Sequence, residues 1–323
     1  MMMRHFLLSC AALLVLSACA IDDKLPQPEK LLRVSTGSYG GVYYPYGVSA
    51  CRLWNADQSL STTRCLVQTS AGSGQNITRL KDGQVDFALV QVDVLAAEIE
   101  RERQAGRESP LRVIVAGPQE ALTVIVNPAS GITNAAALKG KRIALGPQGS
   151  GQRATAQRLF DSLGINIADV QDVPALTSGQ QARLLCTGEL DAALYVSAPP
   201  SGYVAESAAA CGGIILSLDD AVRDGMIARN PHFRRMVVKR DEYRGQVADI
   251  NTIGVGSLVV TRADQPAESV YRLTRLLVGQ VETFKRQHQA LRDTTAAAMA
   301  ATPAFVQRHP GAERYLREAR LLP

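Results

Sequence analysis

Two stretches of the chain repeat the same order of apolar and polar positions. The first copy has an apolar run at 31–36, a glycine-rich turn, amphipathic stretches and a second apolar run at 85–90. The second copy has apolar runs at 142–145 and 192–196 with the same features between them. Short apolar runs that alternate with helical periods predict parallel strands joined by crossover helices.

The match between the two copies extends to single residues. The matched pairs are Gly83 and Gly188, Asp86 and Asp191, Ala88 and Ala193, and Leu89 and Leu194. Both aspartates follow a helix stop and fall within buried strands, so we expect them to hold backbone rather than to act as catalysts. Parallel sheets bind ligands beyond the carboxyl ends of their strands. Two such sheets facing one another predict a clamp.

Periodicity along the rest of the chain predicts further elements of both kinds. Helices are expected over 42–55, 74–81, 93–104, 151–163, 178–186, 202–210, 220–229, 267–288 and 310–320. Strands are expected over 61–68, 112–116, 122–127, 214–218, 233–239 and 250–261. Two crossings, near 120 and 250, predict one lobe from 31–121 plus 250–323 and a second from 122–249. A hinge of two strands between them suits open–close motion.

The first residues predict export and lipid attachment. A short basic start precedes the apolar run 6–16, and Leu16-Ser-Ala-Cys19 follows it directly. This arrangement is typical of a lipoprotein signal peptide over 1–18 that makes Cys19 the diacylated first residue. The run is shorter than the roughly 20 apolar residues that a membrane anchor needs. Residues 19–30 then form a tether, and we expect the protein at the periplasmic face of a bacterial membrane.

Four cysteines remain after Cys19, and an exported location favours disulfides. Their spacing selects Cys51–Cys65 and Cys186–Cys211, one bridge inside each copy of the repeat. A metal site is the weaker interpretation, because no C-x-x-C pair occurs and no histidine lies near these cysteines. We therefore predict no metal.

Charge and motif content argue against nucleic acid and against catalysis. The net charge of +5 is scattered without a basic stripe, so nucleic acid is not expected, although anions are modestly favoured. Metalloprotease, hydrolase, P-loop and dinucleotide signatures are missing. His232, His288 and His309 stand among charges or beside proline, which favours surface positions. We predict neither an enzyme nor a cofactor.

The glycine-rich turns at 36–41 and 146–151 are the main candidates for ligand contact. Glycine lets the backbone expose its N–H groups, and each turn opens a helix whose positive end attracts anions. A plain strand-to-helix turn is the alternative for either turn alone. The residues that we expect to contact ligand are Thr36, Gly37, Tyr39, Gly40, Thr69, Ser70, Gln91 and Asp93 in the first lobe and Gly149, Ser150, Gly151 and Tyr195 in the second.

Several of these candidates have a structural alternative. Asp93 is most often an N-cap and could instead receive a ligand ammonium group. Ser73 is expected to cap the helix over 74–81, and Tyr195 can wall the cleft or pack in the core. Arg153 is expected to be a solvated first-turn residue, so that a ligand carboxylate rests on backbone N–H groups rather than on an arginine.

Five segments together resemble a known family. They are 35–45 (STGSYGGVYYP), 69–76 (TSAGSGQN), 82–93 (DGQVDFALVQVD), 138–151 (LKGKRIALGPQGSG) and 309–315 (HPGAERY). They are similar to the TAXI family, the solute-binding proteins of tripartite ATP-independent periplasmic (TRAP) transporters. The resemblance implies a type II periplasmic-binding-protein fold with a ligand cleft, small carboxylate or amino-acid ligands, and delivery to a permease driven by an ion gradient.

The leading functional prediction is a lipid-anchored receptor that binds a dicarboxylate or an acidic amino acid for a TRAP-type permease. Lipid anchoring and departures from the family pattern, such as Gln152-Arg153, also suit a receptor that signals to a membrane sensor kinase. A third possibility, an enzyme such as a pyrimidine-precursor synthase, requires a histidine with a cysteine or lysine in the cleft. The strand ends supply none.

Overall fold

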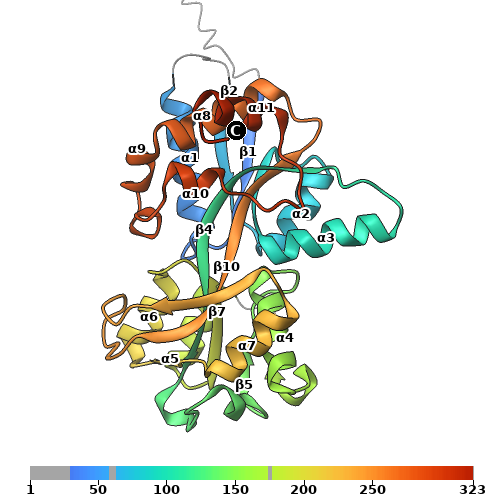
Figure 1. Ribbon diagram of the computed structural model, residues 1–323. Coiled ribbons are helices and arrows are strands. Elements are labelled where there is room, and N and C mark those ends of the chain that lie inside the picture. The colour runs from blue at the N-terminus through green and yellow to red at the C-terminus, as the bar shows by residue number, and fades with distance from the viewer. Residues whose placement is uncertain (1–29, 58–62, 174–176, 323) are drawn as a thin grey trace, which may run out of the picture.

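One mixed sheet runs through both lobes of the computed structural model, which describes residues 30–57, 63–173 and 177–322 (Figure 1). The predicted signal peptide, Cys19 and the tether up to residue 29 lie outside these residues. The strands are β1 (Lys30–Ser35), β2 (Thr63–Gln68), β3 (Phe87–Gln91), β4 (Leu111–Val126), β5 (Arg142–Ala144), β6 (Gln171–Asp172), β7 (Ala192–Ser197), β8 (Ile214–Ile215), β9 (Phe233–Val238) and β10 (Ile250–Arg262).

The order of the strands is a mirror image about its centre. Neighbouring strands follow β2-β1-β3-β10-β4-β7-β5-β6, with β8 beside β4 and β9 beside β10. In each half, the first strand of the repeat lies in the middle and pairs in parallel with the other two. The predicted repeat of parallel units with crossover helices is confirmed.

Helices cover both lobes. Lobe I carries α1 (Tyr43–Ala56), α2 (Ser73–Lys81), α3 (Val92–Gln104), α8 (Ala267–Gly279), α9 (Val281–Lys285), α10 (Ala296–Ala300) and α11 (Pro310–Glu318). Lobe II carries α4 (Gly151–Leu163), α5 (Ser178–Cys186), α6 (Gly202–Cys211) and α7 (Asp220–Arg229). Every helix in the described part of the chain is too short or too polar to cross a bilayer.

The long antiparallel strands β4 and β10 join the lobes, as the two-strand hinge predicts (Figure 1). On β4, pairing with β7 begins at Ala121, close to the predicted boundary. On β10, pairing changes from β9 to β3 between Val255 and Ser257. We therefore propose that the second boundary lies near 256 rather than at 250.

Several expected elements differ in the structure, among them the strand expected over 214–218, of which only Ile214–Ile215 forms as β8. The runs at 112–116 and 122–127 are parts of the single strand β4, which continues through Gly117 and Pro118. The helix expected over 267–288 is broken at Gln280 into α8 and α9. Gly279 stands directly before the break and allows α11 to approach closely, because a side chain there would collide with the Tyr315 hydroxyl of α11, 2.5 Å from an ideal Cβ.

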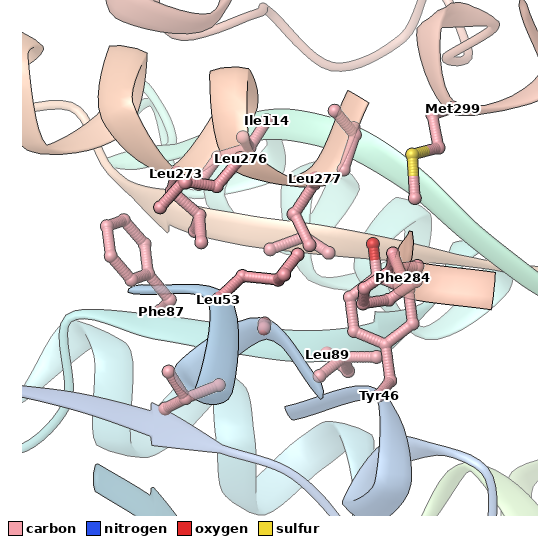
Figure 2. Packing of buried hydrophobic residues seen from close by; sticks show 14 of the residues in the cluster. Tyr46, Leu53, Phe87, Leu89, Ile114, Leu273, Leu276, Leu277, Phe284 and Met299 are labelled. Carbon is pink, nitrogen blue, oxygen red and sulfur yellow. The ribbon is translucent and has the colours of Figure 1, made fainter. Parts of the chain in front are cut away.

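Lobe I has one hydrophobic cluster between its sheet and the helices α1 and α8 and a second that includes residues of α2 and α3. Figure 2 shows Leu273, Leu276 and Leu277 of α8 in one cluster with Leu53 of α1. The ring of Tyr46 meets Phe284 edge-on, with ring centroids 4.8 Å apart. Because α8 and α11 pack together here, the chain ends on lobe I, as expected from the two crossings.

Both predicted disulfides are confirmed. Cys51 of α1 is bonded to Cys65 of β2, and Cys186 of α5 is bonded to Cys211 of α6. Each bridge stays within one lobe, so neither restrains the lobes relative to each other.

Candidate functional site

A cavity of about 300 Å³ lies between the lobes and is lined by residues of both. Its described lining residues are Gly37, Ser38, Gly41, Val42, Tyr43, Ser70, Ala71, Gly72, Ser73, Gln91, Glu120, Pro147, Ser150, Gly151, Gln152, Thr177, Ser178, Tyr195, Val196, Ser197, Ser201 and Tyr203. None of these side chains is a lysine, arginine, histidine or cysteine. The cavity is therefore polar through hydroxyl and backbone groups rather than through cations.

Helices α1 to α6 all begin at the wall of this cavity. Their N-cap residues, which are all cavity-lining, are Val42, Gly72, Gln91, Ser150, Thr177 and Ser201. The first N–H groups of a helix lack partners within the helix, and each N-terminus carries roughly half a positive charge. The convergence of these helix ends favours a negative group in the cavity.

The second glycine-rich turn forms a capped helix start. The Ser150 hydroxyl accepts from the Arg153 N–H at 3.1 Å and donates to the Pro147 carbonyl at 2.7 Å. Gly146 and Gly149 have φ of +102° and +73°, a region that suits glycine. The Gly149 carbonyl accepts from the Gly74 N–H of lobe I at 3.0 Å. Gly149 thus contacts the opposite lobe instead of lining the cavity.

The first glycine-rich turn also contacts the opposite lobe. The Gly40 carbonyl accepts from the Gly202 N–H at 3.2 Å, and an added Cβ at Gly40 would lie 2.6 Å from the Tyr203 ring. The Val42 N–H donates to the Ser197 hydroxyl at 3.1 Å. Tyr39 is 69% exposed and lies outside the cavity. Its predicted ligand contact is not supported, because its ring packs edge-on against Tyr44.

Gln91 and Asp93 connect the lobes where β3 meets α3. The Gln91 amide lines the cavity and donates to Asp93 and to Thr155 of lobe II, both at 3.0 Å. Asp93 is only 2% exposed and lies 3.3 Å from Arg158 of lobe II. Burial raises the pKa of Asp93, and the charge of Arg158 opposes that rise. The expected N-cap role is wrong, since α3 begins one residue earlier without a side-chain cap.

The structure brings half of the predicted ligand contacts to the cavity. Those that line it are Gly37, Ser70, Gln91, Ser150, Gly151 and Tyr195. Those that do not are Thr36, Tyr39, Gly40, Thr69, Asp93 and Gly149. The Thr36 hydroxyl donates to the Gln68 carbonyl, and the Thr69 carbonyl accepts from Arg79, so both hold lobe I together.

Three further expectations about side-chain roles are wrong. Ser73 does not cap α2, because the helix begins at Ser73 itself and its hydroxyl accepts from the Gln91 N–H at 3.0 Å. His309 is buried rather than exposed, and its Nδ1 accepts from the Gly311 N–H at the start of α11. Arg153 is not a solvated residue either, since it donates to Gly146 and Asp172 away from the cavity lining.

Sequence reasoning missed Tyr43 and Glu120, which form a buried pair in the cavity wall. The Tyr43 hydroxyl donates to Glu120 Oε2 at 2.6 Å. Burial raises the pKa of Glu120 to about 8, the Tyr43 hydrogen bond opposes this rise, and the charge of Asp93 adds to it. A lone acid inside the apolar segment 111–126, at the predicted crossing, is the signal that could have revealed it.

Comparison with known proteins shows the family to which this chain belongs. The model of the NMT1-like family matches residues 34–319. The chain belongs to the NMT1-like family. A protein from Bordetella bronchiseptica RB50 is similar in structure, with a TM-score of 0.54 and 12% identity over 90% of this chain and 98% of that chain.

Two further solved structures have a comparable similarity. One is titled a periplasmic transporter, with a TM-score of 0.52 and 14% identity over 91% of this chain and 93% of that one. The other is the ligand-binding component of an ABC-type import system from Staphylococcus aureus, with a TM-score of 0.50, 9% identity and the same coverage. The chain has the type II periplasmic-binding-protein fold. The two structures just described are a transporter and the ligand-binding component of an import system.

Proposed function

We propose that the protein is an extracytoplasmic solute receptor whose lobes close around a small organic anion. The observation that carries this proposal is the cavity between the lobes at which helices α1 to α6 all begin. The positive ends of these helices converge there without a lysine, arginine or histidine among the described lining residues. A carboxylate held in this cavity would touch both lobes.

Contacts between the lobes support closure as the working motion. Gly74 with Gly149 and Gly202 with Gly40 form backbone hydrogen bonds across the cleft. Gln91 with Thr155 adds a side-chain bond. A ligand shifts an open–closed equilibrium only if it binds the two states differently, and a cavity walled by both lobes provides that difference.

Titration calorimetry on the purified full chain tests ligand binding. The panel contains succinate, malate, 2-oxoglutarate, L-aspartate, L-glutamate and propionate, with glucose as a neutral control. We expect saturable binding by at least one anion and none by glucose. A cooperatively folded protein that binds no anion at any concentration tested contradicts the proposal.

The delivery partner that we propose is a TRAP-type permease. The motif resemblance supports this choice, whereas the similar Staphylococcus aureus structure belongs to an ABC-type import system. The genes next to the one for this protein distinguish a TRAP-type permease from an ABC-type import system. Genes for a two-part permease without an ATPase agree with the proposal, and an adjacent ATP-binding subunit contradicts it.

Lipid anchoring through Cys19 is the remaining part of the proposal. It is supported by the sequence Leu16-Ser-Ala-Cys19 after an apolar run. Wild-type protein is expected in the membrane fraction, with a mass that includes acyl chains at Cys19. Cys19→Ala is expected to abolish lipidation, and acylated protein in that variant would contradict the assignment.

A further inference from the structure

Glu120 is the one acidic side chain among the described residues that line the cavity. It lies on β4 opposite Val255 of β10, where the two hinge strands cross from lobe to lobe. Its side chain is 3% exposed. A carboxyl group in this position is unexpected in a wall otherwise rich in hydrogen-bond donors, because it disfavours an anion placed directly beside it.

The surroundings of Glu120 leave one of its oxygens available. Oε2 accepts the hydroxyl of Tyr43 from α1. No described residue donates a hydrogen bond to Oε1, and Glu120 lines the cavity. The nearest other charge is Asp93 of α3, and that carboxyl is paired with Arg158 and Gln91. No cation from the described protein neutralises Glu120.

We propose that Glu120 receives a protonated nitrogen of the ligand, so that the solute carries an ammonium group as well as a carboxylate. This inference rests on the proposed receptor function and narrows its ligand class. The helix N-termini supply donors for the carboxylate, whereas Glu120 is the acidic acceptor among the described residues that line the same cavity. A dicarboxylate would leave that acceptor unmatched and close to a second negative charge.

The protons that Glu120 releases or takes up when ligand binds show whether an ammonium group or an anion lies beside it. Burial raises its pKa to about 8, with Asp93 adding to the rise and Tyr43 opposing it. Near pH 8 the carboxyl is therefore half ionised before ligand binds. An ammonium group beside it lowers its pKa and expels protons, whereas a ligand anion beside it raises the pKa and draws protons in.

The experiment compares ligands that differ only in the amino group, on wild type, Glu120→Gln and Glu206→Gln. The pairs are L-glutamate with glutarate, L-aspartate with succinate, and L-alanine with propionate. Calorimetry at pH 8 in buffers of different ionisation enthalpy gives both affinity and proton exchange. Glu206 is an exposed carboxylate of α6 outside the cavity, so its variant is the matched control.

We expect the best amino acid to bind wild type and Glu206→Gln at least tenfold more tightly than its partner, since a charge-assisted hydrogen bond is lost in the partner. Binding should release about half a proton, as half ionisation requires. Glu120→Gln should lose both the preference and the proton release. If Glu120→Gln does not fold, the wild-type preference and the sign of proton exchange decide alone.

Two failures are distinguishable. If the acid without an amino group binds as tightly or more tightly, with proton uptake, the ammonium inference is wrong while the receptor function stands. If neither member of any pair binds, the proposed anion receptor itself fails.

Discussion

The two copies of the repeat agree in their scaffold and differ at the cleft. The Asp86 carboxylate of lobe I accepts the Arg33 N–H of β1 at 2.8 Å, and Asp191 of lobe II accepts the Arg142 N–H of β5 at 2.8 Å. Both aspartates therefore hold the backbone of the central strand in their lobe. Residues that match between the copies build the sheet, because both lobes solve the same folding problem.

Residues that face the cavity do not match between the copies. In lobe II, the Ser150 hydroxyl caps the start of α4 at the second glycine-rich turn. In lobe I, α1 begins after the first glycine-rich turn without a side-chain cap. Lobe I supplies Tyr43, and the hinge strand supplies Glu120, whereas the described residues that lobe II contributes to the cavity include no acid. Residues that contact ligand are therefore to be sought where the two copies differ, because the residues that match maintain the fold.

The largest expected effect concerns the disulfide within each lobe. Removing either bridge as a double Cys→Ala variant should lower the free energy of unfolding by about 3 kcal/mol, because each closes a loop of 14 or 25 residues. Cys51–Cys65 should cost more than loop length predicts, since both its sulfurs are in the lobe I core. Urea denaturation measures both variants, and wild-type stability in either would contradict this account.

A side chain added at a glycine should hinder closure of the lobes more where the glycine meets backbone of the opposite lobe than where it meets a side chain. A Cβ at Gly74 of lobe I would overlap the Gly149 carbonyl, and a Cβ at Gly151 of lobe II would overlap the Gln91 amide. The amide can move and the carbonyl cannot. Gly74→Ala should weaken binding about 100-fold, or about 2.7 kcal/mol, and Gly151→Ala about tenfold.

Titration calorimetry with the tightest anion checks this difference between the glycines. Gly179→Ala is the matched control, because its Cβ would meet Tyr203 at an ordinary 3.6 Å. The melting temperature of unliganded Gly74→Ala should not fall, since the clash exists only when the lobes are closed. Unchanged affinity in Gly74→Ala would show that the closed contact is not part of binding.

The sequence predicted the elements that local pattern determines. Helices α4, α5 and α7 begin and end where periodicity and caps indicate, and both disulfides follow from cysteine spacing. What it could not predict is which atoms of a turn face inward. Gly40 and Gly149 look like anion-binding glycines, yet each contacts the opposite lobe, which depends on how the lobes close.

Replacing either of the matched aspartates, Asp86 or Asp191, should lower the free energy of unfolding, but by different amounts. Asp86→Ala removes a buried carboxylate from a part-buried N–H and should cost about 2 kcal/mol, whereas Asp191→Ala removes a more exposed carboxylate and should cost about 1 kcal/mol. The hydrogen bond from Arg142 lowers the pKa of Asp191, so its contribution is present above the unfolded pKa and is lost as the pH falls through the folded one.

Urea denaturation at pH 7 and pH 3 measures these contributions. Asp241→Ala, on an exposed loop, is the control and should change stability by less than about 0.5 kcal/mol. The difference between wild type and Asp191→Ala should shrink at the lower pH. Equal stability of Asp86→Ala and Asp241→Ala would contradict a scaffold role for the repeat.

The smallest expected effect concerns Arg153, the arginine nearest the second glycine-rich turn. Its guanidinium donates to the Gly146 carbonyl at 3.0 Å and to Asp172 at 2.7 Å, and it does not line the cavity. Arg153→Ala should therefore change anion affinity by less than about threefold while lowering stability by about 1 kcal/mol. Ser150→Ala removes the N-cap at the cavity wall and should weaken binding more. Calorimetry on both variants decides: loss of binding in Arg153→Ala with intact binding in Ser150→Ala would mean that an arginine, not the helix ends, holds the anion.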